Sequence, residues 1–169
     1  MDVSGKIEMP SAAFQKVEPM NRTRELSSGT EAKPIVLFLC TRNSIRSQMA
    51  EAWLRWHAGD RFIAASAGLE PDQIHPITTQ VMEEVGIPLV GHRSKPISEF
   101  LGRVAVRHIF VVCESAEKNC PRLWPFGGQL SFWPFEDPVS PLADAITQLA
   151  RFRNVRDQVG HKIQEWVKA

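Results

Sequence analysis

The sequence predicts a single α/β domain in which a parallel sheet has helices on both faces. Residues 35–39 and 104–112 are largely apolar runs without regular polar alternation, which is typical of strands buried on both sides of a parallel sheet. Helix-forming segments alternate with the predicted strands, as they do in βαβ units. The 169 residues are enough for one domain with its own core.

Five segments have the length and composition of strands. They are residues 35–39, 61–66, 87–90, 104–112 and 129–132. The run 35–39 is the clearest of them, 129–132 is weaker, and 87–90 is expected to be a short edge segment.

Four segments are predicted to be helices: residues 48–58, 76–85, 98–101 and 142–166. Pro76 is a favourable first-turn residue, and Gly86 is a typical stop signal, so these two residues bound the second helix. In the last helix apolar residues recur every three or four positions, which predicts a long amphipathic helix that closes the domain.

Residues 1–33 carry many small polar residues and no hydrophobic periodicity, so we expect a disordered or loosely attached extension before a domain at 34–169. Binding of a partner is the alternative role for the extension. The N-terminus lacks the apolar core of a signal peptide, and no apolar run approaches the length of a membrane span. The expected compartment is therefore the cytoplasm.

The net charge of +1 gives no reason to expect nucleic acid or a membrane as a partner. Three cysteines in a reducing compartment are free, metal-bound or catalytic thiols rather than structural disulfides. The five histidines share no ligand spacing and are interpreted as ordinary residues. We predict neither a metal site nor an organic cofactor.

The loop that follows the first strand has the features of an oxyanion-binding site. Cys40 ends the strand and Arg46 opens the helix, so backbone N–H groups and the positive end of the helix dipole converge between them. Arg46 can bind two oxygens of a tetrahedral oxyanion, and the same field is expected to lower the pKa of the Cys40 thiol. Asn43 tolerates a left-handed backbone, and the Ser47 hydroxyl can donate to the Cys40 sulfur.

These features predict that Cys40 is a nucleophile beside a bound oxyanion. The remaining loop residues are expected to line or support the oxyanion site: Thr41, Arg42, Ser44 and Ile45. The alternative for Cys40 is a buried structural cysteine at the end of a strand.

Cys113 and Cys120 form a second pair of thiols, seven residues apart. Cys113 ends the strand 104–112, and the segment between the two cysteines is polar and compatible with a helix. Zinc binding is the competing role, but zinc sites favour shorter gaps and four ligands. Asp137, which precedes Pro138, would by itself indicate only a turn.

The motif from Cys40 to Glu51 (CTRNSIRSQMAE) resembles the signature of the low-molecular-weight protein tyrosine phosphatase superfamily, and it is most similar to the arsenate reductase branch. The resemblance extends over about residues 34–167 through further motifs: Ser66–Gly68, Val112–Cys113, Cys120–Pro121, Phe135–Pro138 and Phe152–Asp157.

The resemblance implies a four-stranded parallel sheet and the reduction of arsenate to arsenite. It also implies that Cys113 and Cys120 are resolving cysteines, that Asp137 is the general acid, and that thioredoxin or a similar thiol reductant restores the enzyme. Two alternatives stay open: a phosphotyrosine phosphatase and a non-catalytic oxyanion sensor. True phosphatases have aromatic residues after the Asp-Pro pair, whereas Val139 and Ser140 follow it in this chain.

Some thioredoxin-linked relatives hold a potassium ion behind the loop with Asn, Glu, Ser and a Thr-x-Asp pair. Asn43, Glu51 and Ser66 match the first three, but Arg93 and Lys95 occupy the positions of the pair. We therefore expect Lys95 to supply the positive charge of the ion.

Overall fold

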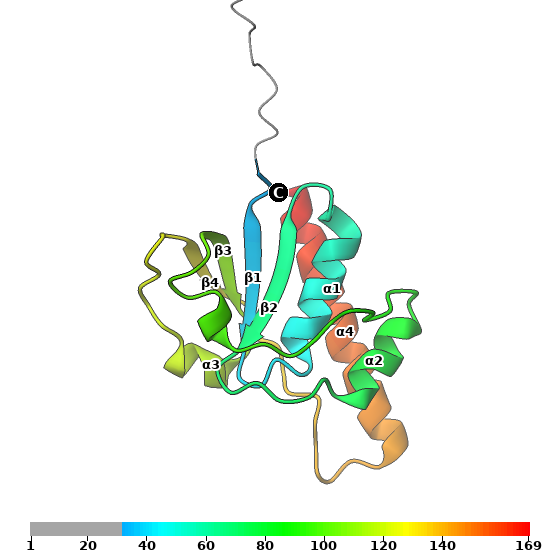
Figure 1. Ribbon diagram of the computed structural model, residues 1–169. Coiled ribbons are helices and arrows are strands. Elements are labelled where there is room, and N and C mark those ends of the chain that lie inside the picture. The colour runs from blue at the N-terminus through cyan, green and yellow to red at the C-terminus, as the bar shows by residue number, and fades with distance from the viewer. Residues whose placement is uncertain (1–31) are drawn as a thin grey trace, which may run out of the picture. The chain divides into compact units, whose positions relative to one another are not determined.

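The computed structural model describes residues 32–169 and contains a four-stranded sheet in the order β2-β1-β3-β4 (Figure 1). Its strands are β1 (Ile35–Cys40), β2 (Ile63–Gly68), β3 (Val106–Val111) and β4 (Gln129–Phe132). All three strand pairings are parallel, so the carboxyl ends of the strands lie along one edge of the sheet. This confirms the expected parallel α/β sheet.

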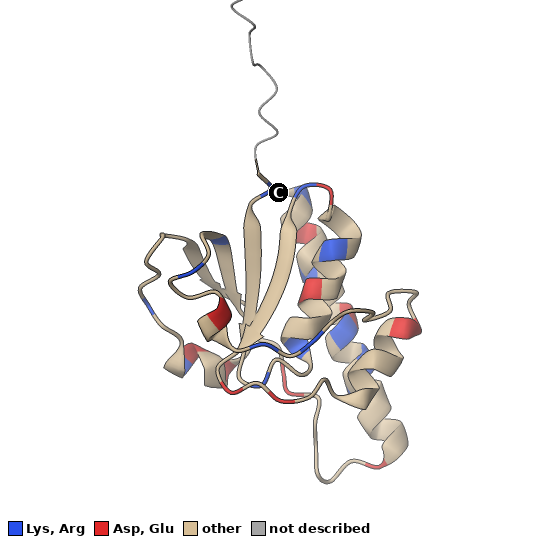
Figure 2. Ribbon diagram, viewed as in Figure 1, with Lys and Arg blue, Asp and Glu red and all other residues tan. Residues whose placement is uncertain are grey.

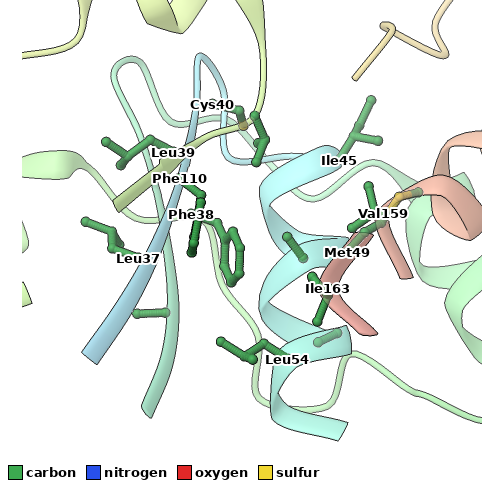
Figure 3. Packing of buried hydrophobic residues seen from close by; sticks show 14 of the residues in the cluster. Leu37, Phe38, Leu39, Cys40, Ile45, Met49, Leu54, Phe110, Val159 and Ile163 are labelled. Carbon is green, nitrogen blue, oxygen red and sulfur yellow. The ribbon is translucent and has the colours of Figure 1, made fainter. Parts of the chain in front are cut away.

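The centre of the sheet is apolar on both faces. β1 and β2 carry no charged residue, so both are tan in Figure 2. In Figure 3, Phe38 points toward the first helix, whereas Leu37 and Leu39 point to the opposite side of β1. The Phe38 ring stacks on Phe110 of β3, with 5.6 Å between the ring centroids. A strand buried on both faces explains the uninterrupted apolar run in the sequence.

The helices are α1 (Arg46–Ala58), α2 (Pro76–Glu83), α3 (Glu114–Asn119) and α4 (Ala145–Lys168), together with the short 3-10 helix η1 (Ile97–Glu99). Helices α1 and α4 lie side by side on one face of the sheet, while α3 and η1 lie on its other side (Figure 1).

The close packing of α1 on α4 requires a glycine at position 160. A Cβ atom at Gly160 would lie 2.6 Å from the Trp53 ring, and the Trp53 Nε1 donates to the Arg156 main-chain oxygen over 3.1 Å. Any larger residue at position 160 would therefore separate the two helices.

The segment 87–90 is not the predicted edge strand. Pro88 has no N–H for a sheet hydrogen bond, and Val90 is 82% exposed, while Ile87 and Leu89 are buried as anchors of an irregular loop. The other boundaries shift by a few residues. The last helix begins at Ala145 rather than at residue 142, because the Asp144 side chain caps it by accepting from the Thr147 N–H over 2.8 Å.

The predicted extension, residues 1–33, lies outside the described residues except for its last two positions. Its boundary and its role stay predictions. Within residues 32–169, no helix is long and apolar enough to cross a membrane.

Candidate active site

The loop between β1 and α1 wraps around the Cys40 sulfur. The Asn43 N–H donates to Cys40 Sγ over 3.0 Å, and the Ser47 hydroxyl oxygen lies 2.9 Å from the same sulfur. The end of β2 approaches this loop closely, since a Cβ at Gly68 would lie 2.8 Å from the Thr41 main-chain oxygen. The loop can therefore close only because residue 68 is glycine.

Asn43 adopts the left-handed conformation that the sequence predicts for the loop, with a φ of 51°. Its side chain is completely buried, and its Nδ2 donates to the hydroxyls of Ser47 and Ser66 over 2.8 Å each. These bonds tie the loop to both α1 and β2.

The first turn of α1 has backbone N–H groups available for an anion. Ile45 is the N-cap residue, and no side chain caps this end of the helix. The first turn also carries no acidic residue. An uncapped helix N-terminus beside a thiol is a favourable place for an oxyanion.

Arg46 and Asp137 are brought together from positions far apart in the sequence. Arg46 Nη2 lies 2.9 Å from Asp137 Oδ2, and Nη1 donates to the Phe135 main-chain oxygen over 3.2 Å. The Arg46 Nε–H is buried and has no hydrogen-bond acceptor among the described residues. A buried donor without a partner is costly, so this N–H marks a place where an acceptor is favoured.

A cavity of about 760 Å³ opens over the loop. It is lined by the loop, by residues 72–76, and by Ser115, Asp137 and Val139. The other predicted loop residues, Thr41, Arg42, Ser44 and Ile45, all line the cavity. The Ser44 hydroxyl also donates to the Gln73 main-chain oxygen over 2.7 Å. The cavity thus gives a solute access to Cys40 from the side of Arg46 and Asp137.

The second and third cysteines lie at opposite ends of α3. Cys113 precedes the helix, is 1% exposed, and has its Sγ 3.5 Å from the Thr41 hydroxyl oxygen. Cys120 follows the helix, is 7% exposed, and has its Sγ 3.5 Å from the Pro121 main-chain oxygen. All three cysteines are free thiols. The structure therefore places Cys113, but not Cys120, directly beside the Cys40 loop.

The expected lowering of the Cys40 pKa is wrong for this structure. Burial raises the pKa of the Cys40 thiol above its ordinary value, and the neighbouring Cys113 adds to the rise. The Ser47 hydrogen bond and the Arg46 charge lower it, but by less. The physical reason is that the sulfur is enclosed, and burial disfavours its charged form.

Behind the loop, Lys95 occupies the position for which the sequence predicts it. Its Nζ lies 3.3 Å from Glu51 Oε2 and donates to the Arg93 main-chain oxygen over 3.1 Å. Glu51 also accepts from the Ser66 hydroxyl. The Arg93 side chain instead points outward to Glu99. The buried Glu51 carboxylate is thus paired with the Lys95 ammonium through one oxygen and with the Arg55 guanidinium through the other.

Three polar residues near the site escaped the sequence reasoning. His75 lines the cavity and caps α2 by accepting from the Ile77 N–H over 3.2 Å. Gln48 and His92 are hydrogen-bonded to each other over 2.9 Å behind the loop. The only available signal was Pro76 in the first turn of α2, since it marks the preceding residue as a cap.

Comparisons with known proteins agree with this geometry. Residues 35–169 match the family described as low molecular weight phosphotyrosine protein phosphatase. The chain is 34% identical to an arsenate reductase of Bacillus subtilis (strain 168), over 79% of this chain and 95% of that protein. A solved arsenate reductase in the phosphate binding state has a TM-score of 0.62 and 34% identity, covering 80% of this chain and 97% of that one.

A further solved structure is a thioredoxin-dependent arsenate reductase from Corynebacterium glutamicum, with a TM-score of 0.62 and 26% identity. That match covers 82% of this chain and 62% of the other.

Proposed function

Because the chain belongs to the low molecular weight phosphotyrosine protein phosphatase family and is similar to arsenate reductases over most of its length, we propose that it reduces arsenate to arsenite. The observation that carries the proposal is the arrangement of the thiols: Cys40 lies in the oxyanion loop, Cys113 lies against that loop, and Cys120 lies at the far end of α3.

Binding of arsenate exchanges the partners of Arg46. The oxyanion takes the N–H groups of the loop and the guanidinium that Asp137 and the Phe135 carbonyl hold in this structure. Asp137 then loses its ion pair with Arg46 and lies beside the bound oxyanion, within reach of a departing oxygen. Substrate binding itself thereby prepares Asp137 as the general acid.

The first chemical steps require two thiols. The Cys40 thiolate attacks arsenic, and the departing hydroxide takes a proton from Asp137 and leaves as water. Cys113 then attacks Cys40 Sγ, and the electron pair of the sulfur–arsenic bond stays on arsenic. Arsenic falls from +5 to +3 and leaves as arsenite, while two thiols become a Cys40–Cys113 disulfide.

Cys120 completes the relay by attacking Cys113, which frees Cys40 as a thiolate. The helical rise places the Cα atoms of residues 113 and 120 roughly 10 Å apart across intact α3, whereas a disulfide needs about 4.4–6.8 Å. Helix α3 must therefore unwind. A helix of six residues has little intrinsic stability, so this rearrangement is feasible.

A thiol reductant is needed to restore the Cys113–Cys120 pair, and thioredoxin or a similar carrier fits that role. The thioredoxin-dependent relative from Corynebacterium glutamicum supports it. The same requirement for free thiols favours a cytoplasmic location, with residues 34–169 forming the catalytic domain.

Phosphotyrosine hydrolysis is the second candidate, because the family description names it and the cavity is much larger than an oxyanion. One observation argues against phosphotyrosine hydrolysis: the cavity is lined near Asp137 by the small, half-exposed Val139 rather than by an aromatic residue.

We expect the purified chain to reduce arsenate with thioredoxin and to hydrolyse a small aryl phosphate only slowly. Hydrolysis needs only the loop, Cys40 and Asp137, so it will survive Cys113→Ser and Cys120→Ser, which both abolish steady-state arsenate reduction. Assays of arsenite and of p-nitrophenol measure the two activities. Efficient turnover of phosphotyrosine peptides without arsenate reduction would favour the phosphatase.

Activity will not depend on whether potassium or sodium is the cation. Lys95 already pairs with Glu51, and a cation about 4 Å from its ammonium would be repelled by about 4 kcal/mol at an effective dielectric constant of 20. Initial rates in potassium and sodium chloride at equal ionic strength measure the effect. Marked activation by potassium would contradict the role of Lys95.

A further inference from the structure

The ring of His75 has one nitrogen engaged by the fold and the other free to serve a ligand. His75 is the N-cap residue of α2, and its Nδ1 accepts from the Ile77 N–H over 3.2 Å. A main-chain N–H only donates, so the proton of the neutral ring is on Nε2. Because His75 also lines the cavity over Cys40, the Nε2–H is the polar group that the ring can offer there.

His75 is held against the loop between β1 and α1. Its main-chain N–H donates to the Ser44 oxygen over 3.1 Å, and the Thr78 hydroxyl donates to the same oxygen over 3.2 Å. The ring packs on the fully buried Phe152 of α4, with 4.8 Å between the ring centroids. The position of the ring relative to the loop is therefore fixed by main-chain bonds and by the core.

Capping α2 does not by itself require a histidine. Asn, Asp, Ser and Thr are the favoured N-cap residues, and they supply the acceptor on a shorter side chain. Histidine accepts with one nitrogen and still donates with the other. The residue type at position 75 therefore indicates a second role for the ring inside the cavity.

We propose that His75 is a substrate-binding residue, which donates its Nε2–H to the arsenate oxygen that leaves. The inference rests on the proposed reduction of arsenate. When Cys40 attacks arsenic, the leaving oxygen lies opposite the sulfur and so faces the cavity rather than the loop. Asp137 lines the same cavity, so His75 holds the oxygen that Asp137 protonates.

The charges around His75 agree with a neutral donor. Burial lowers the pKa of the ring, and the Asp137 carboxylate opposes that shift. Asp72 and Arg42 also line the cavity. An aspartate at position 75 would cap α2 as well, but it would place a third carboxylate beside the oxyanion. A neutral imidazole keeps the cap and adds a donor without adding negative charge.

A donor at this point favours arsenate over an aryl phosphate. The leaving oxygen of arsenate carries no substituent and accepts a hydrogen bond well. In p-nitrophenyl phosphate the leaving oxygen shares its electrons with the ring, and the departing anion spreads its charge over that ring. The Nε2–H therefore stabilises the reaction of arsenate more than that of the ester.

His75→Asn separates the two nitrogens, because the Asn side chain keeps an acceptor for the Ile77 N–H but is too short to replace Nε2. We expect kcat/KM for arsenate, with thioredoxin as the reductant, to fall about tenfold. Hydrolysis of p-nitrophenyl phosphate will stay within about threefold of wild type. His75→Ala, which also loses the cap, will show the same loss for arsenate and a lower melting temperature.

The matched control is His161→Asn, the same substitution at an exposed histidine of α4, which will leave both activities and the melting temperature unchanged. A merely structural role of His75 would lower both activities of His75→Asn together with its melting temperature. That result, or an arsenate kcat/KM within about twofold of wild type, would overturn the proposal.

A second measurement uses wild type and inorganic phosphate, which binds without being reduced. Long-range proton–nitrogen NMR correlations will show the His75 proton on Nε2, and phosphate will shift the Nε2 signal, which is identified by its absence from His75→Asn. A proton on Nδ1, or an Nε2 signal that saturating phosphate does not move, would overturn the proposal. If phosphate moves this signal while wild type reduces no arsenate, the proposed function fails and His75 remains an oxyanion-binding residue.

Discussion

Cys40→Ser will abolish arsenate reduction and any phosphatase side activity, with a loss of about a thousandfold or more. The serine oxygen can keep the hydrogen bonds that Asn43 and Ser47 make to the sulfur, but it has no accessible anion at neutral pH. Oxyanion binding will survive, because the loop N–H groups and Arg46 are unchanged.

The experiment measures arsenite release, aryl phosphate hydrolysis and arsenate binding by calorimetry on the same sample. An unchanged melting temperature is the control. Cys120→Ser is the matched variant for aryl phosphate hydrolysis and arsenate binding, since it removes a thiol without touching the loop, and it still releases about one arsenite per chain. Substantial turnover by Cys40→Ser would remove Cys40 from the mechanism, whatever the role of the other cysteines.

The main elements of the fold could be predicted because long apolar runs and regular periodicity survive in the sequence. β1 is an uninterrupted apolar run, and α4 repeats its apolar residues every three or four positions. The failed prediction at 87–90 has the opposite cause. Ile87 and Leu89 alternate with other residues as in a half-buried strand, yet they anchor a loop that no neighbouring strand pairs with. The polar sequence of α3 was compatible with a helix but did not predict one, because its single buried residue, Ala116, gives no periodic signal.

Some features of the candidate site could likewise be predicted from the sequence, and others could not. Cys40, Asn43 and Arg46 lie within seven consecutive residues, so their residue types and their place between a strand and a helix predicted an oxyanion site. The contact between Arg46 and Asp137 joins positions far apart in the chain, and it was not predicted; the family resemblance indicated only that Asp137 is the general acid.

The remaining site features depend on tertiary structure. The hydrogen bond between Gln48 and His92 could not be predicted from the sequence, because isolated polar residues form no recognisable pattern until the fold brings them together. The raised Cys40 pKa also depends on burial, which a motif does not reveal.

The second large expected effect is the loss of arsenate reduction on removing either resolving cysteine, and it depends on the order of the thiol relay. Cys113 lies against the Cys40 loop and Cys120 lies beyond α3, so the two resolving cysteines cannot exchange roles while the helix is folded. Removing either one will end catalysis after a single turnover at most. The two variants will nevertheless stop at different chemical states.

Cys120→Ser will accumulate the Cys40–Cys113 disulfide and release about one arsenite per chain, because only the final transfer is missing. Cys113→Ser will stall earlier, with little arsenite and no such disulfide, since Cys120 cannot reach the Cys40 sulfur directly. Mass spectrometry of quenched and alkylated proteins identifies each disulfide, and wild type oxidised without a reductant serves as the control with its Cys113–Cys120 bond. Equal arsenite bursts from both variants, or a wild-type product without that bond, would contradict the relay while leaving arsenate reduction itself intact.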